Sequence, residues 1–207
     1  MQFAFFDVCG HHPDAANERL VLADKMKIVG KKVREILATA DRLGAPVLST
    51  TCMGLQREMP GMSVRKTAAG GEGARVAFVP MNATEAEVAH ALTKPRIVFE
   101  RLGCSTGEEN TRRRTYDVFG VNRHATEIVK ALGDRHWLIF GAGFEHCLLA
   151  AVEGLRGLGR PVTVLADGCI HGGISTPVTF IETLERIKLT GARWENADTV
   201  FDAALAA

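Results

Sequence analysis

The sequence lacks the features that mark several specialised classes of protein. Its 207 residues include 25 basic and 24 acidic side chains, a net charge of +1, so it has no basic excess like that of nucleic-acid-binding proteins. No apolar run approaches the roughly 20 residues of a membrane-spanning helix, and residues 1–7 lack the basic start of a signal peptide. We therefore expect a cytoplasmic protein that binds a small-molecule substrate, with no nucleic-acid partner and no membrane partner.

Paired cysteines are also missing. The chain has 5 cysteines, an odd number, and no two of them form a C-x-x-C pair; they are Cys9, Cys52, Cys104, Cys147 and Cys169. This pattern excludes a disulfide framework and a thiolate zinc site. Most of these cysteines are expected to be small core residues, which leaves the question of whether one of them is reactive.

What the sequence does contain is an alternation of apolar runs and helical stretches. Nearly continuous apolar runs occupy residues 3–8, 46–51, 75–79, 96–100, 136–140 and 161–166. Such runs are typical of strands that are buried on both faces of a parallel sheet. We therefore predict an α/β fold for residues 1–207, as a single domain. Its single doubly wound, mostly parallel six-stranded sheet carries helices on both faces, in a Rossmann-like arrangement.

Helix ends are marked by capping and terminating residues. The signals are Gly44 after a first helix, Asn122 before a second, Gly159 after a third and Pro177 at the start of a fourth. Residues 53–73 and 102–114 have no helical or strand period, and we expect them to be loops.

The segment from residue 136 to 155 carries the strongest chemical signal. A strand ends at Phe140, the small residues 141–143 turn the chain, and Cys147 opens a helix. A thiol in the first turn of a helix lies at the positive end of the helix dipole, which favours the nucleophilic thiolate. The N–H groups of the same turn can bind the oxyanion of an acyl intermediate. The alternative is that Cys147 is a small buried residue at a helix start.

The same segment also permits a second interpretation. Gly141 and Gly143 begin a G-x-G-x-x-G pattern, and Asp167 closes the next strand where a ribose-binding acid could lie. The third glycine position, however, holds His146. Dinucleotide binding therefore remains an alternative, and an incomplete motif is the evidence for it.

An acidic residue ends the first predicted strand. Asp7 follows four apolar residues, a position in which a carboxylate can act as a general base or can cap a loop. His11 and His12 follow closely and could reach the same cleft. A single pair of adjacent histidines does not make a metal site.

These residues occur in an order that resembles a known family. The shared positions are Asp7, the strand end Glu100-Arg101, Tyr116-Asp117-Val118-Phe119, the segment from Gly141 to Cys147-Leu148, and Asp167. They resemble the isochorismatase-like cysteine hydrolases, which include nicotinamidases, N-carbamoyl amidohydrolases and isochorismatases, over nearly the whole chain.

The resemblance implies a site made of an aspartate, a lysine and a cysteine. It makes Asp7 the base and Cys147 the nucleophile, and it assigns the oxyanion to the backbone N–H groups of Gly143 and Cys147. It also implies a cis peptide bond between Ala142 and Gly143, and self-association into a homo-oligomer.

The chain departs from the family pattern at the lysine. That position falls on Arg101, or on Arg113 if residues 102–114 are an insertion, and both are arginines. Arginine keeps the positive charge, but with a pKa above about 12 it is a poor proton donor. We expect the Arg101 guanidinium to point into the Cys147 cleft and to pair with Asp7.

Two further departures concern the pocket. Phe144 replaces the small polar residue that the family often has three positions before the cysteine. Residues 49–53 offer none of the metal ligands of nicotinamidases. The resemblance therefore predicts no metal, no other cofactor and no nicotinamidase activity.

The sequence thus predicts a cysteine hydrolase that acts on a small amide or related C–N bond. One alternative is a catalytically impaired binding or regulatory protein of the same fold, because the lysine is replaced. A second alternative is a hydrolase that cleaves a vinyl ether, as isochorismatase proper does. A third is a dinucleotide-binding oxidoreductase.

Overall fold

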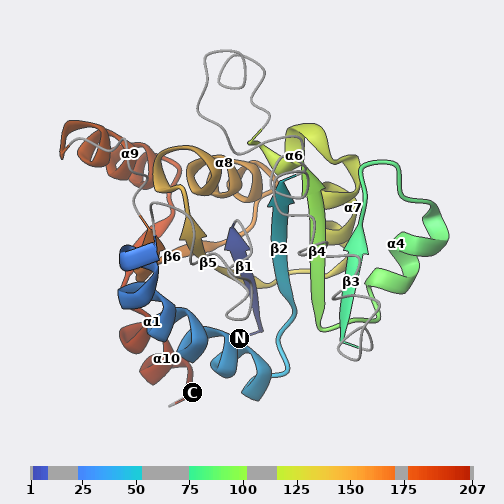
Figure 1. Ribbon diagram of the computed structural model, residues 1–207, viewed down its shortest axis with the longest axis horizontal. Helices are drawn as coiled ribbons and strands as arrows, with labels where there is room; N and C mark the ends of the chain where they lie inside the picture. Colours follow the sequence, from blue (N-terminus) through green and yellow to red (C-terminus); the bar gives the residue numbers. More distant parts are fainter. Residues whose placement is uncertain (1, 9–22, 53–74, 102–115, 171–176, 206–207) are drawn as a thin grey trace.

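A parallel β-sheet organises the chain (Figure 1). The computed structural model describes residues 2–8, 23–52, 75–101, 116–170 and 177–205. Within them, seven strands pair in the order β3-β4-β2-β1-β5-β6-β7, and every pair is parallel. The strands are β1 (Phe3–Val8), β2 (Val47–Cys52), β3 (Val76–Val79), β4 (Arg96–Arg101), β5 (His136–Ala142), β6 (Val162–Ile170) and β7 (Arg193–Glu195).

The predicted α/β class is confirmed, but the predicted number of strands is wrong. All six apolar runs form strands, and β7 is an additional strand at the edge of the sheet. Its three residues, Arg193, Trp194 and Glu195, include two charged side chains and pair only with β6. A strand this short and polar has no apolar run, so it has no local signal.

Eight helical segments are described around the sheet. They are α1 (Ala23–Arg42), α4 (Glu85–Ala91), α6 (Val118–Val121), α7 (Arg123–Ala131), the π turn η3 (Phe144–Leu148), α8 (Leu149–Gly157), α9 (Pro177–Leu189) and α10 (Ala197–Leu205). The four predicted helices correspond to α1, α7, α8 and α9. Helix α4 was not predicted, although Thr84 and Glu87 form a capping box at its start, which is a recognisable sequence signal.

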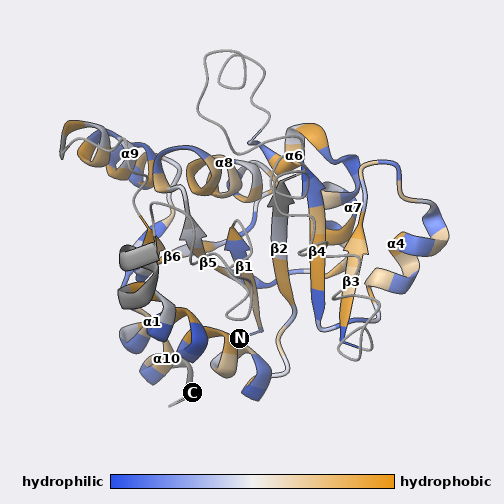
Figure 2. Cartoon of the chain, viewed as in Figure 1, coloured by the Kyte–Doolittle hydropathy of each residue, from blue (hydrophilic) through white to orange (hydrophobic). Residues whose placement is uncertain are grey.

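Two buried clusters lie on opposite faces of the sheet. Helices α1 and α10 cover one face, with Phe5 and Phe140 among the strand residues beneath them. Helices α4, α7, α8 and α9 cover the other face, with Phe6 and Phe99 beneath them. Figure 2 shows the hydrophobic residues along β3 and β4 that contribute to this second cluster. Among the described residues, none of the helices combines the length and the hydrophobicity that a membrane-spanning segment needs.

Strand β1 lies in the middle of the sheet, between β2 and β5 (Figure 1). Asp7 is in register with Ser49 of β2 and with Phe140 of β5. The order of strands reverses here, since the chain runs outward through β2 on one side and through β5 on the other. In open α/β sheets, ligands bind outside the carboxyl ends of the strands at such a switch point. This topology therefore points to the carboxyl ends of β1 and β5 as the place for a site.

Candidate active site

The site begins where β5 passes the end of β1. Gly141 has a φ of 115° and lies opposite Val8. A Cβ atom at Gly141 would lie 2.2 Å from the Val8 carbonyl oxygen and 2.8 Å from its nitrogen. Only glycine permits both this left-handed backbone and this close approach. The packing of β5 against β1 thus explains the first glycine of the G-x-G pattern, and nucleotide binding is not needed to explain it.

Cys147 lies in the π turn that follows β5. The N–H of Leu148 donates to the Gly143 carbonyl at 3.1 Å, five residues back, and η3 continues directly into α8. The Cys147 side chain is buried, with 6% of the residue exposed. It therefore lies in the first turn of a longer helical segment, as the sequence predicts. Single π turns inside helices often occur at functional sites.

The predicted cis peptide bond is wrong. The described backbone contains no cis peptide bond, so Ala142 and Gly143 are joined in trans. The chain turns from β5 into η3 through the positive φ of Gly141 and through Gly143, whose φ is −24° and ψ is 102°. The assignment of the oxyanion to the N–H groups of Gly143 and Cys147 stays a prediction.

Phe144 has a structural explanation that the sequence did not suggest. Its ring lies 5.2 Å from the rings of both Phe180 on α9 and Trp194 on β7. The side chain is fully buried in this aromatic cluster. Phe144 therefore anchors η3 to α9 and β7. This packing explains why a large aromatic residue stands where the family often has a small polar one.

Asp7 and Cys147 come from neighbouring parts of the sheet. Asp7 is next to the end of β1 and is 3% exposed, and Cys147 follows β5, the strand paired with β1. Asp7 shares the strand face of Phe5, which packs under α1, whereas Cys147 packs with α8 on the opposite face. Any contact between the carboxylate and the thiol is therefore made over the carboxyl edge of the sheet.

Arg101 ends β4 and is completely buried. Its Nη1 donates to the carbonyl oxygen of Tyr116 at 3.0 Å. It shares the strand face of Ile97 and Phe99, which is the face that α8 and Cys147 occupy. The guanidinium is thus not turned to solvent. The predicted pairing with Asp7 stays a prediction, and Arg113, His11 and His12 lie outside the described residues.

A short connecting segment, which we call the 116–122 arm, holds the end of β4. The arm runs from Tyr116 through α6 to Asn122. Asn122 Nδ2 donates to the carbonyl oxygens of Val79 and Glu100, both at 3.1 Å, while its Oδ1 accepts from the N–H of His124 and caps α7. The arm therefore contacts both Glu100 and Arg101, and it fixes the backbone that carries the cation.

His146 fills the third glycine position of the incomplete G-x-G-x-x-G pattern, and its place in the structure gives it a second significance. Its ring lies 5.6 Å from the ring of Tyr116, at an interplanar angle of 46°. Both side chains are half-buried, and His146 immediately precedes Cys147 in η3. Tyr116 appeared in the family motif, but its contact with His146 joins segments that are distant in sequence and have no shared local signal.

Cys169 offers a contrast to Cys147. Its thiol donates to the Leu165 carbonyl at 3.2 Å. Burial, together with the nearby charge of Asp167, raises the pKa of the Cys169 thiol far above its usual range. The folded chain therefore favours the neutral thiol of Cys169 over the thiolate.

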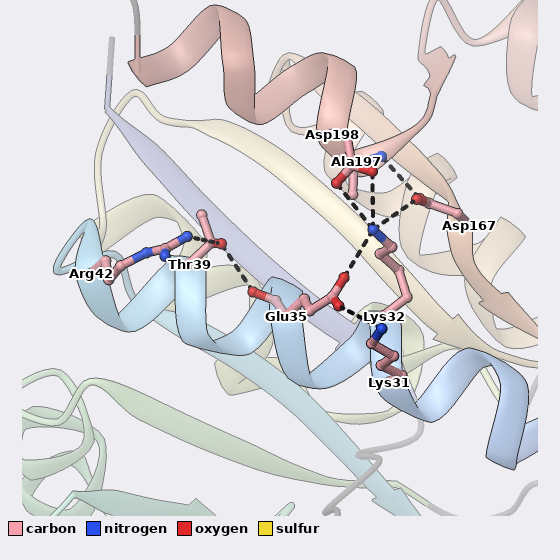
Figure 3. Close-up of polar contacts among 8 residues, drawn as sticks. All are labelled: Lys31, Lys32, Glu35, Thr39, Arg42, Asp167, Ala197 and Asp198. Atoms are coloured by element: carbon pink, nitrogen blue, oxygen red, sulfur yellow. Dashed lines mark hydrogen bonds and ion pairs between the residues drawn. The ribbon is translucent and has the colours of Figure 1, made fainter.

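The acid of the dinucleotide alternative has a different role. Asp167 Oδ1 accepts from the N–H of Ala197 at 2.9 Å and so caps the first turn of α10 (Figure 3). Lys32 of α1 lies beside it and binds the carboxylates of Glu35 and Asp198 at 2.9 and 3.0 Å, which raise the pKa of Lys32. Figure 3 shows these groups joining α1, β6 and α10. Asp167 belongs to this connection, and nothing here favours a ribose.

Strand β2 lacks the carboxylate and imidazole ligands that the nicotinamidases have at this place. Ser49, Thr50 and Thr51 carry hydroxyl groups instead of carboxylates or imidazoles. In the part of the chain that the structure describes, no group of three or more His, Cys, Asp or Glu residues could hold a metal ion. The absence of a metal cofactor stays a prediction for the whole chain.

Comparisons with known proteins agree on the fold. No family model matches the sequence, and no curated protein matches it. Among solved structures, a nicotinamidase from Staphylococcus aureus is similar, with a TM-score of 0.58 and 12% identity over 94% of this chain and 97% of that one. N-carbamoylsarcosine amidase from Thermoplasma acidophilum has a TM-score of 0.57 and 16% identity, over 96% of this chain and 98% of that one.

A third structure is YcaC from Escherichia coli, described as an octameric hydrolase of unknown specificity. Its TM-score is 0.56 at 15% identity, over 94% of this chain and 75% of that one. The matched structures are isochorismatase-like, which confirms the resemblance at the level of the fold.

Proposed function

We propose that this chain, which has the isochorismatase-like fold, is a cysteine hydrolase that acts on a small amide or a related C–N bond. The observation that carries the proposal is the position of Cys147. It is buried in the first turn of the η3–α8 segment, beside the strand that carries Asp7, at the switch point of the sheet. The similar structures are described as a hydrolase, a nicotinamidase and an N-carbamoylsarcosine amidase, which supports this reaction class.

The reaction that these residues could perform has two stages. Asp7 takes the proton of the Cys147 thiol, and the thiolate sulfur attacks the carbonyl carbon of the substrate. The C–N bond then breaks, the amine leaves with the proton from Asp7, and a thioester to Cys147 remains. Water hydrolyses the thioester, which releases the acid and returns the thiol. The oxyanion formed at each stage would be bound by the N–H groups of Gly143 and Cys147.

Arg101 would supply the positive charge that lysine supplies in the family. Its buried guanidinium stays protonated at all relevant pH values, so it can stabilise a carboxylate and a thiolate but cannot shuttle protons. This substitution is also the observation that favours the second candidate, a binding or regulatory protein that has the fold and little turnover.

Ammonia release from a panel of small amides tests the proposal. The panel includes N-carbamoylsarcosine, nicotinamide and simple primary amides. We expect slow turnover of at least one amide by the wild-type chain, its loss in Cys147→Ala, and its retention in Cys169→Ala. We expect Arg101→Lys to raise or alter the activity.

The two candidates give different results in this assay. A folded wild-type chain that binds one of these amides without releasing ammonia, and that gains no activity from Arg101→Lys, would support the binding protein. Turnover that survives Cys147→Ala would contradict the cysteine mechanism.

We also propose how the protein assembles and where in the cell it is located. The Escherichia coli YcaC structure is described as octameric, which supports a homo-oligomer for this chain too. Light scattering of the purified protein would give the number of subunits in the oligomer. We also propose a cytoplasmic location, which the odd number of cysteines in the sequence supports.

A further inference from the structure

We propose that Tyr116 is a positioning residue of the candidate site. Its carbonyl oxygen holds the Arg101 guanidinium, and its ring holds the His146 ring in the turn that carries Cys147. One residue thereby sets the place of the cation relative to the place of the nucleophile. The inference rests on the proposed function, because its consequence is a change in the reactivity of Cys147.

The two contacts of Tyr116 lead to different elements. The hydrogen bond from Arg101 Nη1, at 3.0 Å, leads to the end of β4. The ring contact with His146, at 5.6 Å between centroids, leads to η3 after β5. Strands β4 and β5 are not neighbours, since β2 and β1 lie between them. Tyr116 therefore connects across the carboxyl edge of the sheet two groups that the sheet itself keeps apart.

The remainder of the 116–122 arm is anchored on the same two sides. Asn122 binds the Glu100 carbonyl on the β4 side at 3.1 Å. The Phe119 ring packs against α8, so closely that a Cβ atom at Gly154 would lie 2.2 Å from it. Asp117 accepts from the N–H of Phe119 at 3.1 Å and fixes the first turn of α6. Because the arm is held at both ends, the position of the Tyr116 ring is set by the fold.

Positioning matters here because the charge is buried. Arg101 is fully buried, and a charge in an environment of low dielectric acts strongly on a nearby thiolate, with an effect that falls as the distance grows. A site residue displaced by about 1 Å can lose much of its effect on the reaction. Removing the Tyr116 ring takes away its contact with His146 in η3, and it leaves the main-chain carbonyl that binds Arg101 on an arm with one anchor fewer.

Alkylation of Cys147 by iodoacetamide at pH 7, followed by peptide mapping, tests the inference. We expect Tyr116→Ala to slow alkylation of Cys147 about tenfold, as a loss of thiolate stabilisation would. Tyr116→Phe keeps the ring and the carbonyl and should restore the rate that Tyr116→Ala loses. His146→Ala removes the same contact from the other side and should slow the reaction too.

The double variant distinguishes positioning from independent structural damage. If Tyr116 acts through His146, Tyr116→Ala combined with His146→Ala should be no slower than the slower single variant. Additive losses would overturn the inference, as would a wild-type rate in Tyr116→Ala or a failure of Tyr116→Phe to restore the rate. Should Tyr116→Ala not fold, His146→Ala decides, and a wild-type rate there overturns the inference.

The result for the wild-type chain is separate from these comparisons. If Cys147 of the wild-type chain reacts no faster than Cys169, the proposed function fails, and this inference fails with it. If Cys147 reacts quickly in the wild-type chain and the variants match it, only the role of Tyr116 is lost.

Discussion

At the scale of single residues, the two buried cysteines differ in what surrounds them. Cys147 lies at the start of a helical segment, on the face of the sheet that also carries the Arg101 guanidinium. Cys169 lies within β6, where burial and Asp167 raise its pKa. Since both thiols are almost inaccessible, exposure alone does not separate them, and a difference in reactivity would report the chemical environment.

We predict that Cys147 is alkylated by iodoacetamide at least tenfold faster than Cys169 at pH 7, because only the thiolate reacts. Peptide mapping over a time course measures both rates in the same molecule, so Cys169 serves as the internal control. Faster modification of Cys169 would count against Cys147 as the nucleophile.

The replacement of lysine by arginine changes what the buried cation can do. A fully buried arginine must keep its hydrogen bonds, and one of these is made to a main-chain carbonyl of the 116–122 arm. The geometry therefore suits a fixed positive charge. It does not supply a group that gives up a proton, which is why Arg101→Lys is an informative substitution.

At the scale of elements, helix α8 carries two glycines with different surroundings. A Cβ atom at Gly154 would lie 2.2 Å from the Phe119 ring, whereas one at Gly157 would meet nothing within 4 Å. The first glycine lets the 116–122 arm approach the helix that follows Cys147. The second has no packing role that requires glycine.

The two glycines of α8 give a matched pair of substitutions. We predict that Gly154→Ala lowers the free energy of unfolding by about 1–3 kcal/mol, because the Phe119 ring must move. Gly157→Ala should raise it by about 0.5 kcal/mol through helix propensity. Urea unfolding of both variants measures the difference. A stabilising effect of Gly154→Ala would show that the arm does not press on α8.

At the scale of the whole molecule, a buried histidine lies at the end of the sheet opposite the candidate site. His136 begins β5, and its Nε2 lies 2.8 Å from the hydroxyl oxygen of Thr163. Arg193 Nε donates to the same hydroxyl at 3.2 Å. Burial and the charge of Arg193 lower the pKa of His136, while Glu195 opposes them. The folded chain therefore favours the neutral imidazole.

This shift predicts how stability depends on pH. The unfolded chain binds the proton of His136 below a pKa of about 6.5, before the folded chain does, so stability falls as pH drops below that value. Above it, both states are neutral at this site and the contribution to stability is complete. We predict that His136→Gln, which stays neutral and can hydrogen-bond to Thr163, loses less stability than the wild-type chain between pH 7.5 and 5.5.

Urea unfolding at several pH values compares the two chains. The informative quantity is the difference between them, since the other titrating groups are common to both. A constant difference across this range would show that His136 has the same pKa in the folded and unfolded chains.

Local patterns along the chain are enough to predict many of the strands and helices of this protein. Strands such as β1 and β5 consist of apolar runs, and α7 begins at a residue that caps it. The strand, turn and helix signals on either side of Cys147 predict its place at the start of a helix. These properties are set by hydrogen bonding and burial within a few residues, so they can be read along the chain.

Contacts between residues that are distant in sequence cannot be predicted in this way, because they depend on how the elements pack. Strand β7 forms by pairing with the edge of β6. The Phe144 ring fills the space between α9 and β7. Asp167 caps α10, which begins thirty residues further along the chain. The contact between Tyr116 and His146 likewise depends on the order of strands in the sheet. Contacts of this kind arise from packing between elements, and no local pattern encodes them, because each partner is set by the whole arrangement.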